Sequence, residues 1–114
     1  PYLLCPFFYE GGRLTIADTH FVRELDRLIP AASTPFAKDA AFGFTSSELR
    51  HWIAEKTGGK VGAEQVTSIS LDLIRKGGPK EVARTLLKVA PRTACIVNAV
   101  SYRDMEVGEF FHRF

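Results

Sequence analysis

The chain has 114 residues and a net charge of +2, and 46% of its residues are hydrophobic while 25% are charged. These values are typical of one modest globular domain with a single core. The pI of 8.8 reflects a small excess of Lys and Arg, which is not the basic surface of a nucleic-acid-binding protein. No apolar run reaches the length of a transmembrane helix, and the N-terminal segment lacks the features of a signal peptide. We therefore expect a cytoplasmic protein with no nucleic-acid or membrane partner.

The N-terminal part contains short apolar or alternating segments separated by turn residues, which is typical of β-strands. The turns are indicated at Gly11-Gly12 and Asp18-Thr19, and the segments are residues 3–8, 13–17 and 20–22. They predict a small antiparallel β excursion. Residues 25–32 indicate no clear element, although Pro30 argues against a long helix there.

A helix is predicted over residues 46–57. Thr45 and Glu48 have the spacing of a capping box, in which each side chain bonds the backbone N–H of the other residue. Gly58-Gly59 supplies the left-handed geometry that ends many helices. One apolar face follows from the helical spacing of Leu49, Trp52 and Ile53.

The C-terminal part alternates between strand and helix. Residues 66–71 are rich in β-branched residues, and residues 94–97 are almost continuously apolar, as in a strand buried on both faces. A helix begins after each strand, with Pro79 in the first turn of one and Ser101 before the other. This βαβα order implies parallel strands with a right-handed crossover. The predicted fold class is therefore α/β, with a parallel sheet flanked by helices and the antiparallel excursion near the N-terminus.

The two cysteines, Cys5 and Cys95, lie in apolar segments predicted as strands. A disulfide is one interpretation, but buried free thiols in a cytoplasmic protein are favoured. Neither cysteine has metal-ligand spacing and the histidines are scattered, so no metal site is predicted.

Both ends of the sequence look interrupted. The chain begins without Met inside a predicted strand, and its last apolar residues, Val107, Phe110, Phe111 and Phe114, still follow helical spacing. We expect residues 1–114 to be a single partial domain of a longer protein.

Three segments carry a family resemblance. The run from Cys5 to Thr15, CPFFYEGGRLT, is similar to a Cys-Pro-x-Phe-Pro-x-x-Gly-Arg-x-Thr signal, with Tyr9 in place of the more usual Pro. Residues 36–59 and 97–104 are the other two segments. In this order they resemble the N-terminal domain of the four-carbon acid sugar kinase family.

The resemblance implies an ATP-dependent kinase that phosphorylates a hydroxyl of a small sugar acid such as threonate or erythronate. It also implies two α/β domains, of which the N-terminal one binds the acid and the C-terminal one binds the nucleotide. The family's acidic Asp-Asp motif and its glycine-rich nucleotide-binding domain fall outside residues 1–114. ATP and Mg²⁺ are therefore expected to bind outside this chain, which would be inactive alone. No catalytic residue is assigned, and a homo-oligomer is left open.

A sugar acid presents a carboxylate and several hydroxyls, so its site needs a cation and convergent polar groups. The candidates for the carboxylate are Lys38, Arg50 and Arg13, and those for the hydroxyls are Asp39, Asp18, His20 and Asn98. Lys38 and Asp39 lie in the most specific segment, where the alternative is a pair that fixes the loop. Arg50 lies off the apolar helix face, where the alternative is a solvated charge.

Asn98 and Asp72 each follow a predicted parallel strand, and ligands of open α/β sheets bind at such carboxyl ends. The alternative for both is a turn or cap residue. Asp18 and His20 are two residues apart, which would place both on one strand face as a proton-shuttling pair. The alternative is a histidine paired at the surface. A second function, a non-catalytic α/β small-molecule-binding or regulatory module, remains compatible with all these residues.

Overall fold

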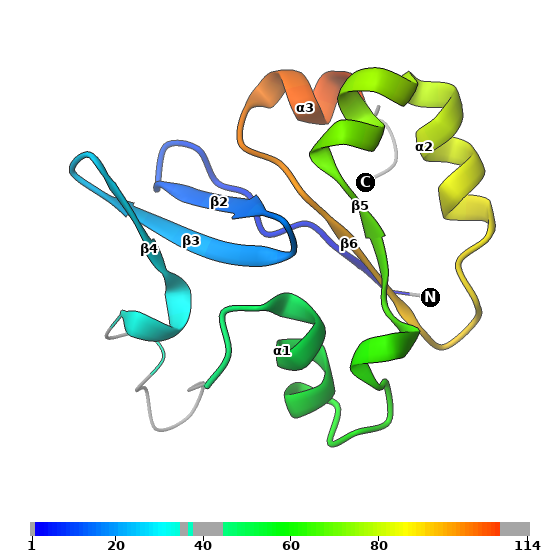
Figure 1. Cartoon of the computed structure of the whole chain (residues 1–114), viewed down its shortest axis with the longest axis horizontal. Coiled ribbons are helices and arrows are strands. Elements are labelled where there is room, and N and C mark those ends of the chain that lie inside the picture. Colours follow the sequence, from blue (N-terminus) through cyan, green and yellow to red (C-terminus); the bar gives the residue numbers. More distant parts are fainter. Residues whose placement is uncertain (1, 35–36, 38–44, 108–114) are drawn as a thin grey trace.

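The computed structural model describes residues 2–34, 37 and 45–107 and contains two small sheets with helices around them (Figure 1). The first sheet is parallel, with strands in the order β1 (Tyr2–Leu4), β6 (Ala94–Val97) and β5 (Thr67–Ile69). The second is antiparallel, in the order β2 (Arg13–Ile16), β3 (Thr19–Glu24) and β4 (Arg27–Pro30). The predicted α/β fold class is confirmed.

Strand β6 is buried on both faces because helices cover each side of the parallel sheet. Its Cys95 and Val97 pack in one cluster with α2 (Gly78–Leu87) and α3 (Tyr102–Val107). Its Ala94 and Ile96 pack on the opposite face with α1 (Leu49–Lys56). Alternation of side chains along one strand thus produces two apolar layers, with the sheet between them.

The βαβα unit is confirmed as β5, α2, β6 and α3, with parallel pairing of β5 and β6. A π-helical turn (η4, Leu73–Gly77) precedes α2, and Pro79 lies in the first turn of α2 as expected. The N-terminal strand differs from the prediction. It ends at Leu4 rather than continuing to residue 8, and it pairs in parallel with β6. Pro6 has no N–H to donate to a ladder, which explains why the strand ends there.

The antiparallel sheet contains one strand that the sequence did not indicate. Residues 27–30 form β4, which pairs with β3 along its whole length and leaves Pro30 as its last residue. Strands β2 and β3 are joined by Ala17 and Asp18, which both have positive φ (49° and 63°). This is the geometry of a tight hairpin turn, and it is unusual because neither residue is glycine. Short helical turns η1 (Ala31–Ser33) and η3 (Ala63–Gln65) complete the described elements.

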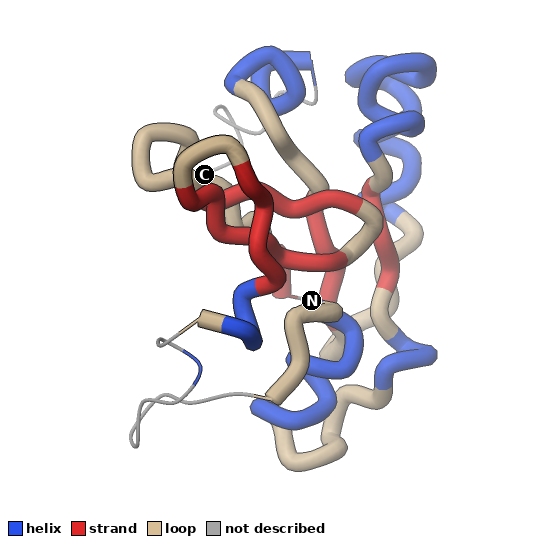
Figure 2. Tube along the Cα trace, turned by 60° about the vertical axis from the view of Figure 1, so that its left-hand side comes forward, coloured by secondary structure: helices blue, strands red, loops and turns tan. Residues whose placement is uncertain are grey.

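The hairpin of β2 and β3 is bonded to both the parallel sheet and α1 (Figures 1 and 2). Thr15 and Ala99 exchange two backbone hydrogen bonds of 3.1 Å, which joins β2 to the residues after β6. The Leu49 N–H donates to the Asp18 carbonyl at 2.7 Å, and the His20 N–H donates to the Ser47 carbonyl at 2.9 Å. The hairpin therefore has a fixed position over the carboxyl edge of the parallel sheet.

The start of α1 differs from the predicted capping box. Glu48 is itself the N-cap, and its carboxylate accepts the N–H groups of Arg50 and His51 at 3.2 Å each. Thr45 instead donates its hydroxyl to Glu55. The apolar face is confirmed by burial of Leu49 and Ile53. The helix begins three residues later than predicted because Ser47 is used in the backbone pairing with the hairpin.

Replacing Glu48 with alanine is expected to lower the free energy of unfolding by about 1 kcal/mol, because two N–H groups of the first turn lose their acceptor. Urea denaturation monitored by circular dichroism measures the loss. The control is Glu106→Ala, which removes an exposed carboxylate from α3. An equal loss in both variants would contradict the capping role.

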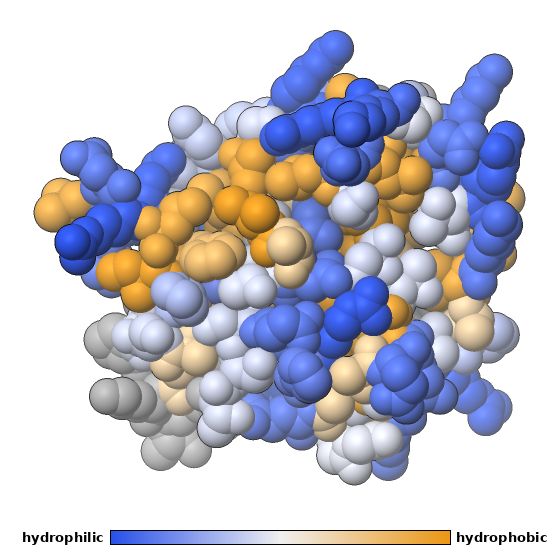
Figure 3. Space-filling view, in the orientation of Figure 1, coloured by the Kyte–Doolittle hydropathy of each residue, from blue (hydrophilic) through white to orange (hydrophobic). Residues whose placement is uncertain are grey.

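The surface divides into apolar and charged regions (Figure 3). On the face that Figure 3 shows, apolar side chains gather over the antiparallel sheet and toward α3. Leu25, in the turn between β3 and β4, and Leu28 of β4 are exposed. Both cysteines are free, and burial raises the pKa of each thiol to about 11, so both are protonated at neutral pH. The prediction of free thiols is confirmed. None of the described helices has the length and hydrophobicity needed to span a bilayer.

Candidate functional site

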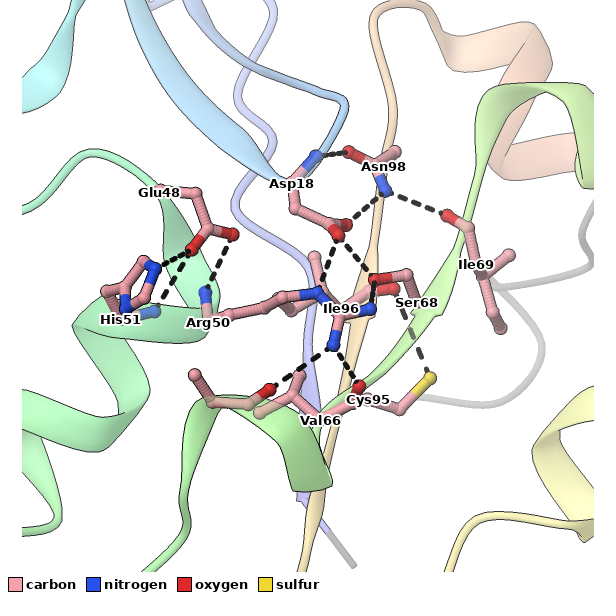
Figure 4. A network of polar contacts seen from close by, with 11 residues as sticks. Asp18, Glu48, Arg50, His51, Val66, Ser68, Ile69, Cys95, Ile96 and Asn98 are labelled. Atoms are coloured by element: carbon pink, nitrogen blue, oxygen red, sulfur yellow. Dashed lines mark hydrogen bonds and ion pairs between the residues drawn. The ribbon is translucent and has the colours of Figure 1, made fainter. Parts of the chain in front are cut away.

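A group of polar side chains lies at the carboxyl edge of the parallel sheet, where the hairpin turn meets it (Figure 4). Asn98, directly after β6, is only 1% exposed. Its Oδ1 accepts the Asp18 N–H at 2.8 Å, and its Nδ2 donates to the Asp18 carboxylate and the Ile69 carbonyl at 3.0 Å each. One amide side chain therefore connects the hairpin turn to two strands of the sheet.

Arg50 approaches the same carboxylate from α1. Its Nε donates to Asp18 Oδ2 at 3.1 Å, and its other nitrogens donate to the Ser68 hydroxyl and to the Val66 and Ala63 carbonyls. The Ser68 hydroxyl in turn donates to Asp18 Oδ2 at 2.6 Å. We call these four side chains, Asp18, Arg50, Ser68 and Asn98, the polar network.

The polar network favours the ionised form of Asp18. Burial alone would raise the pKa of this carboxyl, whose side chain is 16% exposed. Hydrogen bonds from Ser68, Asn98 and Arg50, together with the Arg50 charge, outweigh burial and lower the pKa. Asp18 therefore carries a negative charge at neutral pH, and that charge is neutralised by Arg50.

Each oxygen of the Asp18 carboxylate and each polar atom of the Asn98 side chain has a partner within the chain. Such an arrangement stabilises one geometry, because a buried polar group that is satisfied resists displacement. The polar network thus fixes the hairpin turn, α1 and the sheet edge relative to one another.

A pocket of about 210 Å³ lies next to the polar network, between the hairpin, η1 and the start of α1. We call it the hairpin pocket. Most of its lining surface is apolar, and its polar side chains are one arginine, one histidine, two serines and one threonine. It is lined by Leu4, Pro6, Arg13, His20, Ala31, Thr34, Ser46, Ser47, Leu49 and Trp52.

Arg13 and His20 are the titratable groups in this lining, and they come from neighbouring strands of the hairpin. Burial and then the Arg13 charge lower the pKa of His20 below its ordinary value. The imidazole is therefore neutral at pH 7. Its Nδ1 lies 3.0 Å from the hydroxyl of Thr15, which is fully buried. The pocket thus combines a permanent cation with a neutral histidine.

The candidate site residues predicted from the sequence lie in different parts of the structure. Asp18, Arg50 and Asn98 lie together in the polar network, whereas His20 and Arg13 line the hairpin pocket. Lys38 and Asp39 lie outside the described residues. Asp72 is 81% exposed and forms an ion pair with Lys76. It belongs to neither group.

Two interpretations from the sequence were wrong. Asp18 and His20 do not share a strand face, because Asp18 occupies the left-handed turn before β3. Asp18 bonds Arg50, Ser68 and Asn98, while His20 contacts Thr15, so the two form no proton-shuttling pair. Of the alternative, a histidine paired at the surface, the pairing is present because His20 contacts Thr15, but the side chain is half-buried in the pocket wall.

Arg50 is not the solvated charge that its helical position indicated, because only 33% of its side chain is exposed and it bonds Asp18. Sequence reasoning also missed Ser68 and Thr15. Thr15 is the last residue of the Gly-Arg-x-Thr signal, which could have identified it. Ser68 had no comparable signal, since a single serine within a strand is common.

Among the residues that the structure describes, no three side chains of His, Cys, Asp or Glu gather in the way that a metal ion requires. The described part therefore offers polar recognition and a cation but no metal centre.

By its fold the chain is an α/β domain with a pocket beside the carboxyl end of β1. A family model described as the sugar-binding N-terminal domain matches residues 1–109. The chain belongs to this family of sugar-binding N-terminal domains. No curated protein matches it.

Two solved structures share the fold. The Haemophilus influenzae protein HI1011, described as a DUF1537 protein, matches with a TM-score of 0.69 and 14% identity, over 93% of this chain and 24% of its own. A Salmonella typhimurium LT2 protein that carries the provisional name tRNA synthase matches with a TM-score of 0.70 and 18% identity, over 98% of this chain and 25% of its own. The chain thus spans about a quarter of the length of either protein.

Proposed function

We propose that the chain is the acid-binding part of an ATP-dependent kinase for a small sugar acid of the threonate or erythronate type. The family of sugar-binding N-terminal domains supports the sugar part of this proposal. The resemblance of the Cys5-to-Thr15 run and of residues 36–59 and 97–104 to four-carbon acid sugar kinases supports the acid and the kinase reaction.

The observation that carries the proposal is that Arg13 and His20 line one pocket. A guanidinium binds a carboxylate through two parallel hydrogen bonds, and a neutral imidazole can bond a hydroxyl. The volume of about 210 Å³ lies below the roughly 300–1,000 Å³ of sites for drug-sized ligands, so it suits a smaller molecule. The apolar side chains of the wall would limit the access of water to these contacts.

The phosphoryl donor would bind elsewhere in the longer protein. Phosphoryl transfer depends on positioning and on neutralisation of charge by Mg²⁺ and cations. In this proposal the nucleotide-binding domain holds ATP and Mg²⁺, and residues 1–114 hold the acid with its hydroxyl directed at the donor. The polar network would keep the hairpin, and therefore Arg13 and His20, in place during the reaction.

Replacing Arg13 with glutamine is expected to weaken threonate binding about tenfold, because the charged hydrogen bonds to the carboxylate are lost. Isothermal titration calorimetry of the chain measures the dissociation constant. Arg27→Gln, on the exposed strand β4, is the matched control and should bind as the unmodified chain does.

The kinase reaction requires a separate test. The longer protein is assayed for ATP hydrolysis coupled to phosphorylation of a panel of four-carbon acids. Turnover of one acid supports the kinase. Binding by a well-folded protein without turnover of any acid would favour the non-catalytic small-molecule-binding or regulatory module instead.

A further inference from the structure

The Thr15 hydroxyl lies between two polar groups, the Pro6 carbonyl and the His20 ring. It donates to the Pro6 oxygen at 2.8 Å and lies 3.0 Å from His20 Nδ1. A carbonyl oxygen only accepts hydrogen bonds, and a hydroxyl has a single hydrogen. That hydrogen is therefore used on Pro6, and Thr15 meets the imidazole with an oxygen lone pair.

The position of the Thr15 hydroxyl determines the tautomer of His20. Because Thr15 accepts at this contact, Nδ1 of a neutral His20 carries the proton and donates it. The other nitrogen, Nε2, is then an acceptor without a proton. Thr15 is held rigidly in this role, since it is fully buried and bonds Ala99 through both its N–H and its carbonyl.

We propose that His20 makes the hairpin pocket selective for a hydroxyl over a carbonyl, with Thr15 as the positioning residue that sets the tautomer. Nε2 accepts a hydrogen bond from a ligand hydroxyl, while Arg13 binds the carboxylate of the same molecule. The proposal rests on the proposed function, because it assumes that the pocket binds a sugar acid. It adds the chemical class of that ligand, a polyhydroxy acid rather than an oxo acid.

The selectivity has a simple physical origin. A carbonyl oxygen in place of the ligand hydroxyl would face the lone pair of Nε2, and neither group could donate. A site that bonds a hydroxyl rejects an analogue without that donor, because its own polar group is left unpaired. Most of the wall surface that the described residues form around His20 is apolar, and its other polar side chains are Arg13, Thr34, Ser46 and Ser47.

The tautomer can be measured without any ligand by ¹⁵N NMR of the histidine side chains, with His20 assigned by comparison with His20→Gln. We expect His20 to carry its proton on Nδ1 at neutral pH. Thr15→Val should shift the tautomer ratio toward Nε2–H, and Thr15→Ser, which keeps the hydroxyl, should restore it. A proton on Nε2 in the unmodified chain would overturn the proposal.

Selectivity is measured by calorimetry with threonate and with four-carbon acids in which one hydroxyl at a time is an oxo group. We expect at least one oxo acid to bind about tenfold or more weakly than threonate. His20→Gln, whose amide both donates and accepts, should reduce this ratio toward one. His51→Gln, at a side chain that is 69% exposed, should leave the ratio unchanged.

The possible failures are distinguishable. Equal binding of threonate and every oxo acid overturns the selectivity and leaves the proposed function intact. No binding of any acid by a folded chain overturns the proposed function and the selectivity together. A ratio that survives His20→Gln assigns the selectivity to another residue and overturns the role of His20.

Discussion

Replacing Asn98 with leucine is expected to lower the free energy of unfolding by about 3–4 kcal/mol. Leucine has the same branched shape and a larger volume, so the loss comes from unpaired polar groups and from overpacking rather than from a cavity. The variant leaves the Asp18 N–H without its 2.8 Å acceptor and removes a donor from the Asp18 carboxylate. Each buried group left without a partner costs about 1–3 kcal/mol. Urea denaturation with fluorescence of Trp52 gives the free energy.

The control for Asn98 is Asp72→Ala, at another residue that follows a parallel strand. Its side chain is 81% exposed and pairs with Lys76 one turn further along, so the change should stay within about 0.5 kcal/mol. A loss below 1 kcal/mol for Asn98→Leu would show that the polar network does not stabilise the fold.

The βαβα unit could be predicted because its signals are local and consistent. A continuous apolar run at residues 94–97 indicates a strand buried on both faces, and Pro79 indicates where a helix begins. Strand β4 could not be predicted in this way. Most of its residues are exposed, so it has no apolar pattern, and it forms because β3 offers it a hydrogen-bonding edge.

The residues of the polar network could be predicted in part, but their contacts could not. Asn98 was identifiable as a candidate because carboxyl ends of parallel strands are common sites. Its contact with Asp18 was not, because the two residues are 80 positions apart and meet only through the left-handed turn at Ala17 and Asp18. A turn was indicated at Asp18-Thr19, but without a glycine there was no indication of the positive φ of Ala17 and Asp18. The strand alternation assumed for Asp18 and His20 therefore placed Asp18 wrongly.

The position of Arg50 could not be predicted for a related reason. Helical periodicity shows that Arg50 lies off the apolar face of α1, and most such arginines are solvated. It does not show that the hairpin turn covers this side of the helix and brings a carboxylate within 3.1 Å. The polar face of a helix becomes partly buried only when another element packs on it, and that packing is a tertiary property.

Replacing Asp18 with asparagine is expected to lower the free energy of unfolding by about 2–3 kcal/mol at pH 7. Asparagine tolerates the positive φ of this position, so the backbone turn is retained. The loss arises because the neutral amide leaves a partly buried guanidinium without its counter-charge, and because its NH₂ would face the Asn98 Nδ2 donor when its oxygen accepts from Arg50 and Ser68. Urea denaturation at a series of pH values measures this loss.

The difference between the Asp18→Asn variant and the unmodified chain should depend on pH in a defined direction. The pKa of Asp18 is lower in the folded chain than the unfolded value of about 3.9. The unfolded state therefore binds more protons than the folded state between the two pKa values. The contribution of Asp18 to the free energy of unfolding is complete above about pH 5, and it is lost as the pH falls through the folded pKa. The stability gap between the two proteins should shrink toward pH 3. Asp104 also has a lowered pKa, but it is present in both proteins and cancels in the comparison.

A gap that stays constant from pH 7 to pH 3 would mean that the Asp18 charge does not stabilise the hairpin over the sheet edge. The loss in the variant would then come from the mismatched amide rather than from the missing charge.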